Sequence, residues 1–177
     1  MKILGLIGSP RIGGNTDLLV DRIFEGSKSK GYSTEKIYLY DYNISLCTDC
    51  QSCKKGDYIC CINDEMEKIY PKMAAADIII FGTPLYWFGP TAKMKMLIDR
   101  LRPFVKNRQL EGKKAIVVCP SADGSTACGP LLDMFRLIFD YLKIKFENRI
   151  LVTAYDKGEI AQNKEEMDKA FELGYSF

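Results

Sequence analysis

The sequence alternates between short apolar runs and longer segments with helical periodicity, and this alternation is the feature that most limits the fold. The apolar runs predict buried strands at residues 2–8, 35–40, 77–82, 114–119 and 145–153. The segments that follow them predict amphipathic helices at residues 15–30, 64–76, 91–101, 130–142 and 160–173. Five successive strand–helix units predict an α/β fold, a three-layer α/β/α sandwich around a five-stranded parallel sheet.

The chain has 177 residues and no linker-like stretch, which predicts one domain over residues 1–177. Pro71 stands inside the second predicted helix, and we expect it to kink or split that helix. In a parallel sheet of this kind, ligands bind outside the carboxyl ends of the strands. The candidate loops for a functional site are therefore residues 8–16, 41–63, 82–91 and 119–129.

The chain contains no histidine. This excludes Ser-His-Asp and Cys-His nucleophilic sites, His-ligated zinc and Rieske-type clusters. A net charge of +2 gives no indication of nucleic-acid binding, and no apolar run approaches the ~18 residues of a membrane span. The apolar start at residues 3–8 is too short for a secretory signal. We therefore expect a cytoplasmic protein whose cysteines serve as metal ligands, redox groups or buried apolar side chains.

The loop at residues 8–16 combines several groups that bind phosphate. It lies between a predicted strand and a predicted helix, where backbone N–H groups and the helix N-terminus favour an anion. The loop matches neither the dinucleotide-binding glycine pattern nor the Walker A pattern, which requires a lysine. It therefore predicts a phosphate loop for a mononucleotide, with the candidate residues Ser9, Arg11, Gly13, Gly14, Asn15 and Thr16.

Three consecutive aromatic residues, Tyr86, Trp87 and Phe88, lie in the loop at residues 82–91. Aromatic side chains gathered on a surface loop predict contact with something flat and apolar. A flavin ring suits this description, because the loop's backbone amides could reach the polar edge of the ring. The alternative is that these aromatic residues pack over the end of the sheet or form a subunit contact.

Five of the seven cysteines fall within residues 47–61, with the spacing C-x2-C-x2-C-x6-C and Cys61 in addition. Three thiolates at intervals of three can surround one face of a compact inorganic core, and a fourth closes it. Structural zinc usually has two C-x2-C pairs separated by a longer span. An iron–sulfur cluster, redox-active thiols and a zinc-stabilised module are the alternatives here. Cys119 and Cys128 are expected to be buried thiols.

The motifs GLIGSPR at residues 5–11, GNT at 14–16 and PLYW at 84–87 resemble the NADPH-dependent FMN reductase family of flavodoxin-like proteins. The resemblance is clear over about residues 1–120. It implies that the FMN phosphate binds Ser9, Arg11, Asn15 and Thr16. It also implies that the flavin ring lies against Pro84, Leu85, Tyr86, Trp87 and Phe88. The far side of the ring would be lined by Ser121, Ala122, Asp123 and Gly124.

Residues 47–73 look like the iron-sulfur flavoprotein branch of the same family, whose members bind one [4Fe-4S] cluster through a compact cysteine motif. The resemblance implies that the cluster ligands are Cys47, Cys50, Cys53 and Cys60. Cys61 is then the extra cysteine. The cluster would lie near the flavin, or near the flavin of a neighbouring subunit.

The expected function is that of an FMN-dependent oxidoreductase in which the cofactor performs the chemistry and no side chain acts as a catalyst. The resemblance implies NAD(P)H or a redox protein as electron donor, and oxygen, peroxide or a quinone as acceptor. It also implies a homo-dimer or homo-tetramer. The alternatives are an NAD(P)H-dependent FMN or quinone reductase without a cluster, and a flavodoxin-like electron carrier that is not an enzyme.

Overall fold

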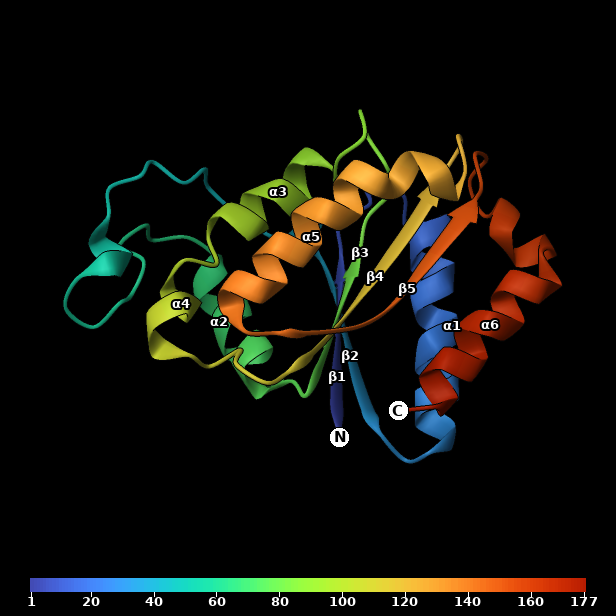
Figure 1. Ribbon diagram of the computed structural model, residues 1–177, viewed down its shortest axis with the longest axis horizontal. Helices are drawn as coiled ribbons and strands as arrows, with labels where there is room; N and C mark the ends of the chain where they lie inside the picture. Colours follow the sequence, from blue (N-terminus) through green and yellow to red (C-terminus); the bar gives the residue numbers. More distant parts are fainter.

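A five-stranded parallel sheet forms the centre of the computed structural model, which describes residues 1–177 (Figure 1). The strands, in the order β2-β1-β3-β4-β5, are β2 (Ser33–Tyr38), β1 (Lys2–Ile7), β3 (Ile78–Gly82), β4 (Lys114–Ser121) and β5 (Lys145–Thr153). All neighbouring strands pair in parallel. This is the doubly wound order of flavodoxin-like proteins, and it confirms the predicted fold.

Helices cover both faces of the sheet (Figure 1). One face carries α1 (Asn15–Ser29) and α6 (Lys164–Tyr175), which pack against each other. The opposite face carries α2 (Met66–Ala75), α3 (Ala92–Asp99), α4 (Pro103–Asn107) and α5 (Gly129–Leu142). Short 3-10 turns occur at Leu39–Asp41, Ser52–Lys54, Ser125–Cys128 and Glu159–Gln162.

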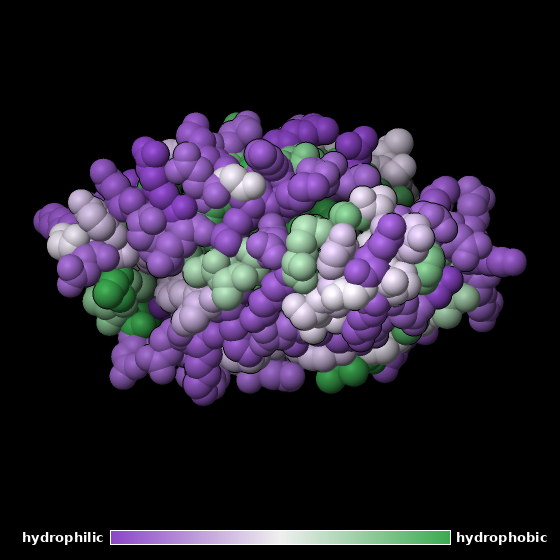
Figure 2. Space-filling view, turned by 90° about the horizontal axis from the view of Figure 1, so that it is seen from below, coloured by the Kyte–Doolittle hydropathy of each residue, from purple (hydrophilic) through white to green (hydrophobic).

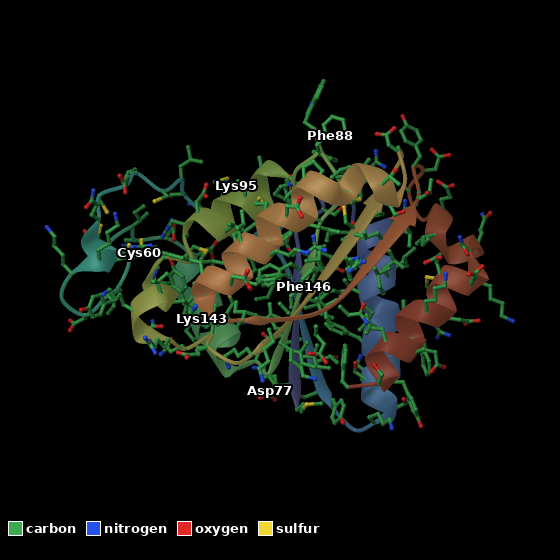
Figure 3. All side chains as sticks on the ribbon, in the orientation of Figure 1. Cys60, Asp77, Phe88, Lys95, Lys143 and Phe146 are labelled. Atoms are coloured by element: carbon green, nitrogen blue, oxygen red, sulfur yellow. The ribbon has the colours of Figure 1, made fainter.

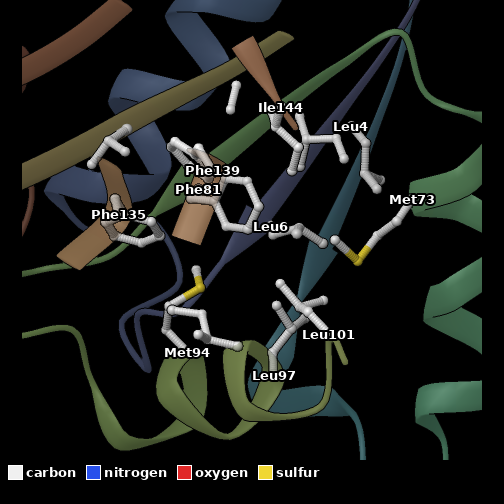
Figure 4. Close-up of a cluster of buried hydrophobic side chains, with 14 of the residues drawn as sticks. Leu4, Leu6, Met73, Phe81, Met94, Leu97, Leu101, Phe135, Phe139 and Ile144 are labelled. Atoms are coloured by element: carbon white, nitrogen blue, oxygen red, sulfur yellow. The ribbon is translucent and has the colours of Figure 1, made fainter. Parts of the chain in front are cut away.

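The side chains of each central strand alternate between two hydrophobic cores, as the period of a β-strand requires. Leu4 and Leu6 enter the core beneath α2, α3 and α5, which contains 27 buried residues (Figure 4). Ile3 and Ile7 enter the smaller core of 15 buried residues beneath α1 and α6. Burial on both faces explains why the central strands read as nearly continuous apolar runs.

Of the two expected effects of Pro71, a kink or a split, the split does not occur, because α2 is a single helix from Met66 to Ala75 with Pro71 inside it. Proline removes one backbone hydrogen bond, which the carbonyl of Glu67 would otherwise accept. Glu67 and Pro71 both lie on the exposed side of α2. Water can therefore reach the carbonyl that lacks its helical partner.

Two further differences concern short elements. Helix α4 was not predicted, and the predicted helix at residues 160–173 is a 3-10 turn followed by α6. The separation occurs at Asn163, whose side chain accepts a hydrogen bond from the backbone N–H of Glu166 and begins the new helix.

The long connection from residue 42 to residue 65 extends away from the sheet and contains five of the seven cysteines (Figure 1). On the face at the amino ends of the strands, hydrophilic residues cover most of the surface (Figure 2). None of the helices has the length and apolar character needed to cross a membrane.

Candidate functional site

A cleft opens at the carboxyl ends of the strands, beside β1 and β3, the neighbouring strands between which the strand order changes direction. The loops after β1, β3, β4 and β5 converge there. Its lining consists of Ser9, Arg11, Asn15, Thr16, Pro84, Leu85, Tyr86, Pro120, Ser121, Ala122, Ala154 and Tyr155. In doubly wound sheets this switch point is where a ligand binds. The structure thus brings together residues from three of the loops expected from the sequence.

Other residues expected at the site do not line this cleft. They are Gly13, Gly14, Trp87, Phe88, Asp123 and Gly124. Three lining residues were missed by sequence reasoning, namely Pro120, Ala154 and Tyr155. The rule that ligands lie at the carboxyl ends of strands would have found Ala154 and Tyr155, because they follow β5 directly.

The N-terminus of α1 faces the cleft without a side-chain cap. Gly14 is the N-cap residue and offers no side chain, while Asn15 and Thr16 in the first turn are buried and line the cleft. The first backbone N–H groups of a helix lack partners within the helix and attract anions. A Cβ atom on Gly14 would lie 2.8 Å from the carbonyl oxygen of Arg11, so glycine permits this tight turn. The arrangement suits a phosphate group.

Gly13 turns its backbone away from the cleft. Its N–H donates to the carboxylate of Asp17 over 2.8 Å, and that carboxylate also accepts from Lys36 at 2.6 Å and from Tyr38 at 2.9 Å. Burial disfavours the charge on Lys36, but hydrogen bonds to Asp17 and Asp21 outweigh it, so the pKa of Lys36 is raised. Asp17 therefore holds the loop in place from behind, with its charge balanced by Lys36.

Asn15 connects the phosphate loop to the segment after β5. Its amide nitrogen donates to the carbonyl of Asp156 at 2.8 Å, and its amide oxygen accepts from the N–H of Ile160 at 3.1 Å. Arg11 donates to the carbonyl of Tyr155 at 3.2 Å. The family resemblance implies Asn15 as a phosphate ligand; in the structure its side chain lines the cleft and also holds the fourth wall in position through these hydrogen bonds.

The aromatic loop is a tight hairpin. The backbones of Tyr86 and Gly89 exchange hydrogen bonds of 2.9 and 3.0 Å, and Trp87 and Phe88 between them have φ angles of +49° and +61°. Two positive φ angles are the mark of a type I′ turn. Tyr86 lines the cleft, whereas Trp87 is 97% exposed and Phe88 projects outward at the tip (Figure 3).

The residues of the cleft fit the two ends of FMN, its phosphate and its flavin ring, in different places. The enclosed hollow measures about 160 Å³, below the roughly 300–1,000 Å³ typical of small-molecule pockets. This volume suits the phosphate end, beside the uncapped helix, Arg11 and Thr16. The flavin ring is larger and would extend over the rim, where Leu85, Tyr86 and Ala122 provide apolar contacts.

Four cysteines of the loop line a second hollow, and Cys60 lies at one end of the molecule, away from Phe88 of the aromatic loop (Figure 3). The four cysteines are Cys47, Cys50, Cys53 and Cys60, and Asp99 and Arg102 border the same hollow. Burial raises the pKa of the Cys53 thiol, and the neighbouring thiols Cys60, Cys47 and Cys50 act in the same direction. The thiols are thus close enough to influence one another, although no three potential ligands are arranged as a metal site.

Cys61 lies outside this hollow and contacts Cys50, with the two Sγ atoms 3.4 Å apart. Hydrogen bonds from the side chain and backbone of Ser52, and then from Cys61, lower the pKa of the Cys50 thiol to about 7. Cys119 and Cys128 are buried, as expected from the sequence.

A buried ion pair closes the base of the cysteine loop. The guanidinium of Arg100 binds Asp64 and also donates to the carbonyl oxygens of Ser45 and Ile62. Both ends of the loop are therefore attached to one side chain of the segment after α3.

The fold and the cleft define a flavodoxin-like protein with a mononucleotide-type site. The sequence model of the NADPH-dependent FMN reductase family matches residues 1–152, and the chain belongs to this family.

Two curated relatives are similar over different lengths. An iron-sulfur flavoprotein of Methanocaldococcus jannaschii is 41% identical over 70% of this chain and 65% of its own length. Another, from Methanosarcina thermophila, is 38% identical over 56% of this chain and 52% of its own length. The chain thus spans about half to two thirds of these relatives.

Among solved structures, the Trp repressor binding protein from Bacillus subtilis superimposes with a TM-score of 0.74 and is 25% identical, covering 98% of this chain and 99% of that one. An NAD(P)H:quinone oxidoreductase from Methanothermobacter marburgensis has a TM-score of 0.70 and is 18% identical, and the superposition covers 99% of this chain and 94% of that one. The latter likeness concerns the fold.

Proposed function

We propose that the protein binds FMN in the cleft and exchanges electrons between that flavin and a [4Fe-4S] cluster carried by the cysteine loop. The observation that carries the flavin assignment is the convergence of the loops after β1, β3 and β4 on one cleft beside an uncapped helix N-terminus. Family membership supports the same assignment. FMN supplies hydride and single-electron transfer at its ring.

The side chains of the cleft divide into binding and positioning groups. Arg11, the hydroxyl of Thr16 and the backbone N–H groups of the first turn of α1 bind the phosphate. Leu85, Tyr86 and Ala122 contact the ring, and Ser121 offers a hydroxyl at its edge. Asn15 and Asp17 hold the loops in position through the hydrogen bonds described above.

The cluster assignment rests on two observations. Cys47, Cys50, Cys53 and Cys60 line one hollow, and two relatives of the chain are named iron-sulfur flavoproteins. Four thiolates are the donor set of a [4Fe-4S] cluster. Arg102 borders the hollow and provides positive charge opposite the thiolates.

The cysteine loop projects from one end of the molecule, away from the carboxyl ends of the central strands (Figure 1), and this separation favours electron transfer between subunits. We therefore propose a homo-dimer or homo-tetramer in which the loop of one subunit approaches the flavin of another. The donor would be NAD(P)H or a redox protein, and the acceptor oxygen, peroxide or a quinone.

An FMN or quinone reductase without a cluster is the second candidate. It is favoured by the absence of a metal-like arrangement among the thiols. In that case NAD(P)H would reduce the flavin directly and the loop thiols would be free.

The decisive experiment is anaerobic purification followed by visible spectroscopy and assays of iron and acid-labile sulfide. Flavin with about four irons per chain supports the proposal. Flavin without iron would contradict the cluster and support the reductase without a cluster. Zinc without flavin would contradict both candidate functions. Cys53→Ser should abolish iron binding, whereas the matched variant Cys61→Ser should retain it.

A second measurement addresses the flavin. Arg11→Ala should weaken FMN binding by about 10- to 100-fold, the loss expected for a charged hydrogen bond of about 1.5–3 kcal/mol. Arg149→Ala, on β5 and outside the cleft, is the control. Rapid NADPH oxidation with a dye acceptor would then argue against a carrier that is not an enzyme.

A further inference from the structure

Two exposed thiols of the cysteine loop are in contact. The Sγ atoms of Cys50 and Cys61 lie 3.4 Å apart, and the two residues are separated by 11 positions in the chain. Both side chains are exposed to solvent. Because a disulfide has an S–S distance of about 2.05 Å, the sulfur atoms would need to approach by about 1.4 Å.

Cys61 has no place among the four thiols that line the hollow, although its neighbour Cys60 does. The loop around the pair has no strand, and its single 3-10 turn ends at Lys54. No regular hydrogen-bonded element therefore opposes the small movement that would bring the two sulfur atoms together.

We propose that Cys50 and Cys61 form a reversible thiol–disulfide pair that closes when a peroxide oxidises the protein. The thiolate of one cysteine attacks hydrogen peroxide, which forms a sulfenic acid and releases water. The second thiol attacks the sulfenic sulfur, which forms the S–S bond and releases a second water molecule. The two sulfur atoms lose two electrons and peroxide gains two, and a small dithiol reverses the reaction.

Formation of the bond removes Cys50 from the hollow and leaves three thiols there. This consequence rests on the proposed cluster, because a [4Fe-4S] cluster takes four cysteines. The pair would then decide whether the loop can take up iron. The disulfide itself requires no cluster and can be tested without one.

The molecule contains its own control. Cys119 and Cys128 lie at a similar distance, with Sγ atoms 3.7 Å apart, but both are buried. Peroxide needs access to the sulfur, so exposure should distinguish the two pairs.

The test uses the full chain with its FMN, freed of iron by a chelator, and hydrogen peroxide as the probe. Free thiols are alkylated after oxidation, and the protein is digested with trypsin. Lys54 and Lys55 lie between the two cysteines, so cleavage there places Cys50 and Cys61 on different peptides. A Cys50–Cys61 bond appears as a linked peptide, whereas a Cys60–Cys61 bond leaves the second peptide unlinked and two hydrogen atoms lighter than its reduced form.

We expect the linked peptide with the bond at Cys50 and Cys61, its loss on reduction, and full alkylation of Cys119 and Cys128 after denaturation. Cys61→Ser should abolish the link and Cys60→Ser should retain it, with circular dichroism showing that both variants are folded. A link that survives in Cys61→Ser, a bond between other cysteines, or no bond at all would overturn the proposal.

A second arm separates this proposal from the proposed cluster. Iron uptake is measured in the oxidised protein, before and after treatment with dithiothreitol. Iron uptake that is lost on oxidation and regained on reduction supports the full proposal. Iron uptake that the mapped disulfide leaves unchanged would show that the Cys50–Cys61 bond does not control whether the loop takes up iron. A protein that never takes up iron contradicts the cluster alone, because the peptide mapping stands independently.

Discussion

Arg100 and Asp64 form a two-pronged ion pair that is almost entirely removed from solvent. The guanidinium Nη1 lies 2.7 Å from one carboxylate oxygen and Nη2 lies 3.1 Å from the other, with 0% and 1% of the two side chains exposed. The backbone N–H groups of Ser45 and Met66 also donate to Asp64. Such a pair contributes little over an apolar core, but leaving one member alone is costly.

Replacing Asp64 with asparagine should destabilise the protein by about 3–5 kcal/mol, because the charge of Arg100 stays buried without its partner. Urea unfolding monitored by circular dichroism measures the change. Asp133→Asn is the matched control, since Asp133 pairs with Arg136 on the surface and the pair is largely exposed. Equal effects of the two substitutions would show that burial of the ion pair does not matter.

The same pair predicts a pH dependence. Burial alone would raise the pKa of Asp64, but hydrogen bonds from Arg100 and from two backbone N–H groups outweigh it, and the pKa is lowered. Because the folded-state pKa lies below the unfolded value of about 3.9, ionised Asp64 contributes stability above that pH. This contribution is lost progressively as the pH falls from the unfolded pKa towards the folded one. The stability difference between the natural protein and Asp64→Asn should therefore be constant near neutrality and shrink below about pH 4. A difference as large at pH 3 as at pH 7 would contradict this reasoning.

The fold could be predicted from the sequence because strands buried on both faces of the sheet consist of nearly continuous apolar residues. The apolar runs at Ile78–Gly82 and Lys114–Ser121 admit no other interpretation once helical segments alternate with them. Pro71 was misjudged because its effect depends on which side of the helix it occupies. The sequence shows that a proline is present, whereas only packing shows that the affected carbonyl faces water.

The candidate site could be predicted in its loops but not in its individual side chains. Ser9 and Tyr86 line the cleft as expected, whereas Trp87 points outward because two positive φ angles turn the hairpin at that position. Asn15 lines the cleft as expected, but its side chain also hydrogen-bonds a segment 141 residues further along the chain. Contacts of that kind follow from the assembled fold and leave no local pattern.

The hairpin geometry separates the roles of neighbouring aromatic residues. Tyr86→Ala should weaken FMN binding several-fold, because it removes part of the cleft wall. Trp87→Ala should leave the affinity of an isolated subunit nearly unchanged, because the indole is 97% exposed. Fluorescence titration of the dilute protein with FMN measures both values. Should Trp87→Ala have the larger effect, the ring would lie on the outer side of the hairpin.

Asn15 should control both flavin affinity and the order of the segment after β5. Asn15→Ala removes the hydrogen bonds to Asp156 and Ile160, at a cost of about 1–3 kcal/mol for each buried group left without a partner. Lys157 is exposed within that segment, so trypsin should cleave after it faster in the variant, and FMN affinity should fall about tenfold or more. Asn148→Ala, on the exposed side of β5, is the control. Unchanged cleavage after Lys157 would mean that other contacts hold the segment in place, and a loss of affinity without faster cleavage would return Asn15 to the role of a direct phosphate ligand.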